Sequence, residues 1–111
     1  MNYARELLKG NTDALILHLV NCQPTYGYQI IRELEKKSNG YFRFKEGTLY
    51  PALHRLEKDQ LIIGKWEMTP NRQQRRYYHI TEKGIQALAN RLSTWQEFST
   101  AVKAVIRPET T

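Results

Sequence analysis

Residues 47–58 read Gly-Thr-Leu-Tyr-Pro-Ala-Leu-His-Arg-Leu-Glu-Lys, and the rest of the chain is organised around this stretch. Leucines recur in it at helical spacing, at positions 49, 53 and 56, so one side of a helix should face a core. Thr48 can cap the helix and Pro51 is tolerated in a first turn, which places the start near Gly47. The other faces carry Thr48, Tyr50, His54 and Arg55. Such a helix suits a DNA major groove, and the alternative is an ordinary amphipathic surface helix.

The positive charge of the chain is concentrated in its middle. The chain has 111 residues, which is typical of one domain, and a formal net charge of +6. Between Lys36 and Arg76 there are ten Lys or Arg and four Asp or Glu, a surplus of six, whereas the remainder is balanced. This segment predicts a polyanionic partner, namely double-stranded DNA, although a solvated basic face would give the same count.

Composition also bears on where the protein acts. The sequence has no apolar run of about 18 residues, and its N-terminus does not resemble a signal peptide. The single cysteine, Cys22, excludes an internal disulfide and favours a reducing compartment. We therefore expect a cytoplasmic protein that makes no membrane contact.

Three helices are predicted upstream of the central one. Residues 3–9 form a short helix that ends at Gly10, and Thr12 caps a second helix that is apolar on nearly all sides and therefore buried. Thr25 caps a third helix, which ends at residues 38–40. The side chains of this helix that we expect to face the core are Tyr28, Ile31, Leu34 and Ile30. Residues 41–45 are a short aromatic connector.

Two strands should follow the central helix. Residues 61–68 and 75–80 are rich in β-branched and aromatic side chains, and residues 69–74 form a turn between them. Together they form a two-stranded hairpin with a basic tip at Arg72, Arg75 and Arg76. The fold class is thus mainly α with a small β-hairpin, and residues 1–80 are expected to form a winged helix-turn-helix domain.

The chain ends in a long helix, predicted for residues 81–107, with Thr81 as its cap. Apolar residues recur along it in steps of three and four, which is typical of a coiled-coil seam. We expect a homodimer formed by this helix and the short first helix, with an interface of Leu7, Leu8, Ile85, Leu88, Leu92, Trp95, Phe98, Val102 and Ile106. The alternative is that the helix folds back on its own domain.

Three motifs resemble the phenolic acid decarboxylase repressor (PadR) family. They are Tyr-Gly-Tyr-Gln-Ile at 26–30, Gly-Thr-Leu-Tyr-Pro-Ala-Leu-His-Arg-Leu-Glu at 47–57 and Arg-Arg-Tyr-Tyr-His-Ile-Thr-Glu-Lys-Gly at 75–84. The resemblance implies a homodimeric bacterial transcription regulator, usually a repressor, that binds an inverted repeat. Because this C-terminal helix is short for the family, the chain resembles the small subfamily, which includes multidrug-sensing repressors. Gln60 stands where the family usually has glycine, a minor departure because glutamine can occupy a left-handed or bridging position at some cost.

The resemblance also implies which residues meet DNA. Thr48 and Tyr50 match the family's recognition helix, and Arg75 and Arg76 match its basic wing. Of the two tyrosines at 77 and 78, one would pack on the recognition helix and the other would face DNA or solvent. The full set of candidate DNA contacts is Tyr26, Gln29, Lys45, Gly47, Thr48, Tyr50, His54, Arg72, Arg75 and Arg76.

Trp95 falls where multidrug-sensing relatives carry a tryptophan that stacks on flat aromatic ligands across the dimer. The resemblance therefore suggests a small aromatic effector, with a pocket lined by Leu7, Ala14, His18, Arg91, Trp95 and Ser99. The alternative is that Trp95 is simply interface core.

No catalytic or metal motif stands out. His18 and Cys22 lie four residues apart on one helix, but two ligands do not make a zinc site. Glu33, Glu35 and Glu57 are expected to be solvated helix charges. We predict no enzyme, no cofactor and no metal. The sequence favours a dimeric, ligand-responsive DNA-binding repressor, and the alternative is a winged-helix protein-interaction module that never binds DNA.

Overall fold

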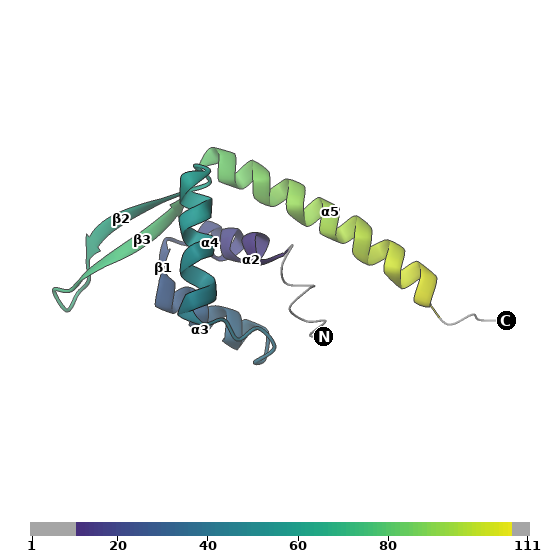
Figure 1. Cartoon of the computed structure of the whole chain (residues 1–111), viewed down its shortest axis with the longest axis horizontal. Coiled ribbons are helices and arrows are strands. Elements are labelled where there is room, and N and C mark those ends of the chain that lie inside the picture. The colour runs from purple at the N-terminus through teal and green to yellow at the C-terminus, as the bar shows by residue number, and fades with distance from the viewer. Residues whose placement is uncertain (1–10, 108–111) are drawn as a thin grey trace.

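The computed structural model of the chain describes residues 11–107, so the predicted helix at residues 3–9, with Leu7 and Leu8, lies outside the described residues. The elements in order are α2 (Thr12–Cys22), β1 (Thr25–Tyr26), α3 (Gly27–Lys37), α4 (Glu46–Lys58), β2 (Ile62–Met68), β3 (Gln74–Ile80) and α5 (Glu82–Ile106). The fold is mainly helical with a small antiparallel sheet, as the sequence predicts. Figure 1 shows the hairpin and α5 leaving the helical body in different directions.

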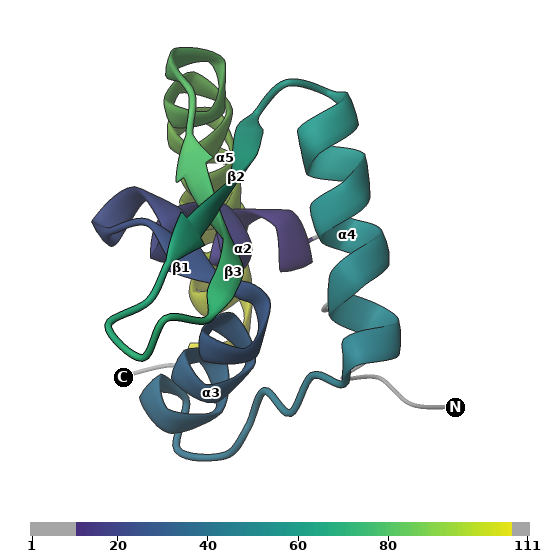
Figure 2. The same cartoon turned by 90° about the vertical axis from the view of Figure 1, so that its left-hand side faces the viewer.

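The sheet has three strands in the order β1-β3-β2, and Figure 2 shows it facing α4. The short strand β1 is not predicted from the sequence, because two residues are too few to show alternation. It pairs Thr25 with Tyr78 and Tyr26 with Tyr77. Thr25 is therefore a strand residue, and the predicted Thr25 cap is wrong because Tyr26 holds the N-cap position of α3.

The core is built around α2, which packs against α3, α4, α5 and β3 as expected of a helix that is apolar nearly all round. The largest fully buried side chains of the core come from α2, α3, α4 and β2: Ile16, Leu17, Ile30, Leu49, Leu53, Leu56 and Ile62. One prediction for α3 is wrong, since Tyr28 is 56% exposed. The inward face of α3 is set instead by Ile30 and Leu34.

Helix α4 begins at Glu46, one residue before the predicted start. Lys45 holds its N-cap position without a side-chain hydrogen bond, so Thr48 lies inside the first turn and is not the cap. Pro51 lies within the helix and cannot donate the backbone hydrogen bond of its turn. Four residues of α4 are buried and fix which side faces outward: Leu49, Ala52, Leu53 and Leu56.

The turn from α4 into β2 needs a left-handed residue. Leu61 N–H donates to the Leu56 carbonyl at 2.9 Å and Gln60 N–H donates to the Glu57 carbonyl at 3.0 Å, a Schellman-type ending. Gln60 takes the left-handed position with φ of 63°. Of the left-handed and bridging conformations that glutamine can adopt at this departure from glycine, the structure has the left-handed one.

Helix α5 begins at the predicted cap and then leaves the domain. The Thr81 hydroxyl accepts from Gly84 N–H at 2.9 Å. Leu88 is buried in the core of this chain, with 5% of its surface exposed, so its assignment to a dimer interface is wrong. Beyond it the large apolar side chains are exposed, so the alternative that the helix folds back on its own domain holds only for its first part, which packs against α2.

The left-handed turn yields a stability prediction. Replacing Gln60 with glycine should stabilise the fold by about 0.5–1 kcal/mol, because relief of the left-handed strain exceeds the added chain entropy of glycine. Equilibrium urea unfolding by circular dichroism measures it. The matched control, Gln86→Gly in the exposed helical interior of α5, should lower stability by about 1 kcal/mol. A Gln60→Gly protein less stable than the natural chain would contradict the account of this turn.

Candidate nucleic-acid interface

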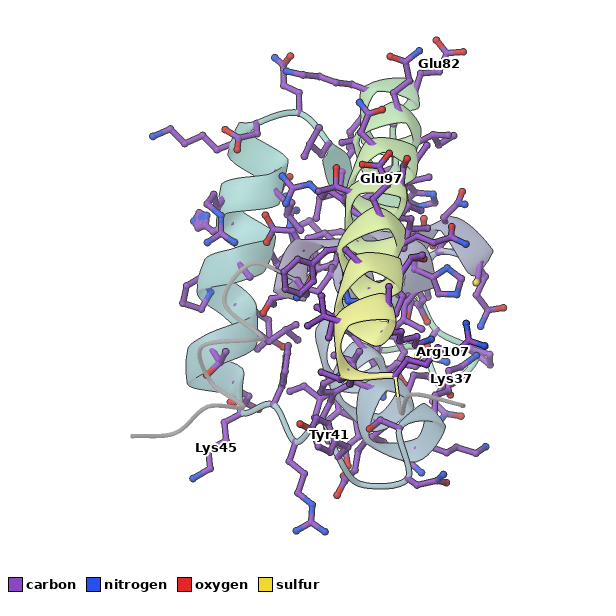
Figure 3. The ribbon with its side chains drawn as sticks, turned by 90° about the vertical axis from the view of Figure 1, so that its right-hand side faces the viewer. Lys37, Tyr41, Lys45, Glu82, Glu97 and Arg107 are labelled. Carbon is purple, nitrogen blue, oxygen red and sulfur yellow. The ribbon has the colours of Figure 1, made fainter. Side chains whose placement is uncertain are left out.

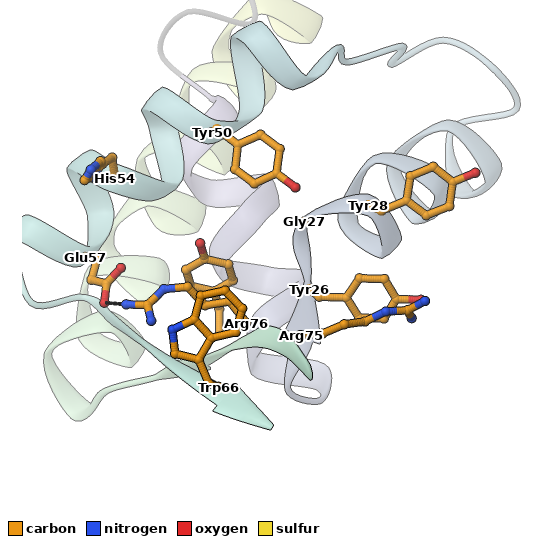
Figure 4. A pocket seen from close by; sticks show the side chains of 10 residues that line it. Tyr26, Gly27, Tyr28, Tyr50, His54, Glu57, Trp66, Arg75 and Arg76 are labelled. Atoms are coloured by element: carbon orange, nitrogen blue, oxygen red, sulfur yellow. Dashed lines mark hydrogen bonds and ion pairs between the residues drawn. The ribbon is translucent and has the colours of Figure 1, made fainter. Parts of the chain in front are cut away.

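The outer side of α4, the hairpin and the start of α3 border one cavity of about 740 Å³ (Figure 4). Its lining is aromatic and basic: Tyr26, Gly27, Tyr28, Tyr50, His54, Glu57, Trp66, Arg75, Arg76 and Tyr78. Five of the candidate DNA contacts therefore come together here from elements far apart in the sequence, namely Tyr26, Tyr50, His54, Arg75 and Arg76.

Tyr50 projects from α4 toward α3 at one side of this cavity (Figure 4). A Cβ atom on Gly27 would lie 2.6 Å from the Tyr50 hydroxyl oxygen, so the absence of a side chain at Gly27 allows this close approach. Tyr50 nevertheless stays 45% exposed. A half-exposed phenol on the outer face of a helix can donate to or accept from a base edge or a phosphate.

Arg75 lies near the tip of the hairpin, where it is held by stacking. Its guanidinium carbon lies 4.4 Å from the centre of the Tyr26 ring, within cation–π range. The Tyr26 ring in turn meets Tyr77 edge-on at 5.4 Å, across the β1–β3 pairing. Stacking orients the guanidinium but leaves its charge uncompensated, so Arg75 can still meet a phosphate.

Arg76 has a different environment. Its Nη2 atom donates to Glu57 Oε2 at 2.7 Å, and the backbone N–H of Gly64 donates to the same oxygen at 3.1 Å. The expectation that Glu57 is a solvated charge is therefore wrong. Glu35 is more exposed than Glu57 and pairs with Arg43, whereas Glu33 is about as exposed as Glu57 and pairs with Lys37.

The two tyrosines of β3 differ in burial. Tyr78 is buried beside α4, whereas Tyr77 is half-buried against Tyr26. Burial raises the pKa of the Tyr78 phenol above its ordinary value, and the positive charge of Arg76 opposes that rise. Tyr78 therefore stays neutral at physiological pH and serves as packing between the hairpin and the helix.

The other candidate contacts surround the cavity without lining it. Lys45, Gly47 and Thr48 are exposed at the start of α4, and Lys45 projects outward in Figure 3. Arg72 is exposed at the hairpin tip with φ of 62°. Gln29 lies in a neighbouring depression together with Arg32 and Lys36, and it accepts from the Thr25 hydroxyl at 3.1 Å.

Sequence reasoning missed Trp66, Tyr28 and Glu57 as members of this site. Trp66 is directly opposite Arg76 in the β2–β3 register, so the two side chains share one face of the hairpin. Strand alternation from buried Ile62 places Trp66 on that face, a signal that was available in the sequence. Nothing local indicated that Tyr28 would turn outward.

Among the predicted effector residues, Leu7 lies outside the described residues, and the others lie on α2 and α5. Trp95 is 51% exposed on α5, His18 is exposed and Ala14 is buried. Arg91 Nη1 donates to Asp13 Oδ2 at 3.2 Å, while the other oxygen of Asp13 accepts from Arg55 at 2.5 Å. Arg91 is thus paired with a carboxylate, which the sequence did not indicate.

The part of the chain that the structure describes contains no group of three or more side chains able to hold a metal ion. His18 Nε2 lies 3.6 Å from Cys22 Sγ, so the two side chains interact directly with each other. Within residues 11–107, no helix has the length and hydropathy needed to cross a membrane.

A helical core, an outward-facing polar helix and a basic hairpin beside it define a winged-helix transcriptional regulator. Residues 16–90 match the model of the transcriptional regulator PadR-like family. The chain belongs to that family, whose members regulate transcription and are not enzymes, and this role implies DNA binding.

Characterised sequences and solved structures agree with this membership. The chain is 34% identical over 98 residues to the transcriptional regulator Rv3488 of Mycobacterium tuberculosis, with 88% of each chain covered. A PadR-like transcriptional regulator from Bacillus cereus is 34% identical and superposes with a TM-score of 0.85, covering 94% of this chain and 99% of that one. A transcriptional regulator from Clostridium thermocellum is 28% identical, with a TM-score of 0.83 over 92% and 99% of the two chains.

Proposed function

We propose that the protein is a homodimeric repressor that binds an inverted-repeat operator and is released by a small aromatic ligand in the bacterial cytoplasm. In this proposal α4 enters the major groove with Thr48, Tyr50 and His54 near base edges. Arg75 and Arg72 meet the backbone beside it. The observation that carries the proposal is the outward polar face of α4 standing next to a hairpin whose cations face the same cavity.

Dimerisation is supported by the uncovered stripe on α5. Phe98 is 62% exposed, and the other large apolar side chains on its outer part are also exposed: Leu92, Trp95, Val102, Val105 and Ile106. A contiguous apolar surface of this kind marks an interaction site, and the repeat of three and four residues matches a second helix. Two α4 helices linked in this way would read two half-sites of an inverted repeat.

The first prediction of this proposal concerns salt. On a duplex from the promoter upstream of the protein's own gene, binding should weaken steeply as salt rises, by about a thousandfold between 50 and 200 mM if about six phosphates are neutralised. A gel shift at several salt concentrations measures it, with a scrambled duplex of equal length as control. Absent or salt-independent binding would favour the alternative, a protein-interaction module with this fold.

The second prediction concerns the α5 stripe. Leu92→Glu should yield monomers in sedimentation experiments and lose tight operator binding, because a charge buried in the seam would cost several kcal/mol. Ser93→Glu is the matched control, since it places the same charge one residue away on the other side of the helix, and it should remain dimeric. A Leu92→Glu protein that sediments as a dimer would place the interface elsewhere.

The effector part of the proposal depends on Trp95. A half-exposed indole in the middle of a helix–helix seam offers a flat face for stacking. Ser99 lies one turn further along α5, and Arg91 lies one turn before Trp95. Because Arg91 is already paired with Asp13, its charge is less available to an anionic ligand than the sequence alone would indicate.

The third prediction tests this pocket by fluorescence. In a Trp66→Phe background, planar aromatic dyes should quench Trp95 saturably, with about one ligand per dimer at a symmetric interface. The reverse variant, Trp95→Phe with Trp66 retained, is the control and should not show saturable quenching. If Trp95→Ala sediments as a monomer, or if a broad panel of aromatic compounds fails to quench Trp95, then Trp95 is interface core and not a ligand platform.

A further inference from the structure

The carboxylate of Glu57 joins α4 to both strands of the hairpin. Glu57 lies in the last turn of α4, and a single oxygen, Oε2, accepts from Arg76 on β3 at 2.7 Å and from the Gly64 N–H on β2 at 3.1 Å. The side chains of Glu57 and Arg76 are 31% and 35% exposed, respectively. A charge-assisted bond with a second donor on the same oxygen holds its partners in a narrower range of geometries than a free surface pair does.

Gly64 is what lets Arg76 reach Glu57. A Cβ atom at position 64 would lie 2.5 Å from Arg76 Nε and 2.7 Å from its Cζ, so any side chain there would displace the guanidinium. Trp66 borders the same guanidinium, with its ring centre 5.8 Å from Cζ (Figure 4). The path of Arg76 across the hairpin is therefore set by a missing side chain on one side and an indole on the other.

Arg75 and Arg76 are neighbours in sequence but differ in charge balance. The stacked Arg75 keeps a net positive charge, whereas the charge of Arg76 is offset by Glu57. If Arg76 turned toward a phosphate, Glu57 would be left half-buried without its ion-pair partner and close to the DNA anion. Removing one partner of such a pair is costly because the other charge is left uncompensated.

We propose that Arg76 and Glu57 are positioning residues that set the distance between α4 and the hairpin, and that Arg76 does not neutralise a phosphate. The inference rests on the proposed DNA binding and assigns roles within it. With this spacing fixed, α4 can lie in the major groove while Arg75 and the hairpin tip reach the adjacent backbone. The sequence motif does not distinguish the two arginines of the hairpin, but in this proposal Arg75 contacts a phosphate and Arg76 positions the hairpin.

The inference is tested with full-length variants on a duplex that the natural protein selects from a random-sequence pool. Arg75→Gln should lower the slope of log affinity against log salt by about one, since one phosphate contact is lost. Arg76→Gln should leave that slope unchanged yet weaken binding by about tenfold, because the hairpin loses its spacing from α4. The double variant Glu57→Gln with Arg76→Gln should be no weaker than Arg76→Gln alone, since both remove the same link.

Glu57→Gln gives the sharpest distinction. Removing a negative charge from a DNA-facing surface should tighten binding if only electrostatics matter. Loss of the positioning link should weaken it. Glu46→Gln, an exposed carboxylate in the first turn of the same helix, is the matched control and should tighten binding slightly. The proposal is overturned if Glu57→Gln tightens binding as Glu46→Gln does, or if Arg76→Gln lowers the salt slope as Arg75→Gln does.

A second measurement needs no DNA. Amide hydrogen exchange of Gly64 should accelerate in Glu57→Ala and stay unchanged in Glu46→Ala, because the Glu57 carboxylate accepts from that N–H. Unchanged exchange in Glu57→Ala would overturn the positioning role. If the natural protein selects no duplex at all, the proposed DNA binding fails, and this exchange measurement still decides whether Glu57 holds the hairpin.

Discussion

The backbone around Leu61 is where α4 ends, the hairpin begins and α5 starts. The Leu61 carbonyl accepts from Thr81 N–H at 3.1 Å, and the Thr81 hydroxyl donates to the Gln60 carbonyl at 2.7 Å. A Cβ atom on Gly84 would lie 2.1 Å from the Leu61 oxygen, so the first turn of α5 can sit against this carbonyl only because residue 84 is glycine. The junction therefore fixes the direction of α5 relative to α4. In the proposed dimer, that direction would set the distance between the two α4 helices.

A second link joins the same two helices through α2. Asp13 holds Arg55 of α4 with one oxygen and Arg91 of α5 with the other, and its side chain is only 14% exposed. Because both arginines are partly exposed, such pairs contribute little to stability. Their effect is geometric: the helix with the proposed base contacts and the helix with Trp95 share one carboxylate. A displacement of α5 near Arg91 would therefore act on the same anion that holds α4.

The positive surplus of the central segment is not uniformly available to a partner. Arg43, Arg55 and Arg76 each pair with a carboxylate of the same chain, although only Glu57 among those acids lies in the surplus segment. Within residues 11–107, Lys45, Arg72 and Arg75 are the cations on the proposed DNA face that form no ion pair with a carboxylate. A charge count identifies a basic segment, but the placement of acids from other helices decides which cations remain for phosphates.

The sequence by itself determined the features that depend on near neighbours in the chain. Leucine spacing predicted α4 and its buried side, and Thr81 predicted the start of α5. Tertiary structure decided the rest. The two-residue strand β1, the outward turn of Tyr28, the burial of Leu88 and the Glu57–Arg76 pair all depend on elements that are distant in sequence. Periodicity and capping act over a few residues, whereas these pairings require the angles at which helices and strands pack, and those angles are set by the whole core.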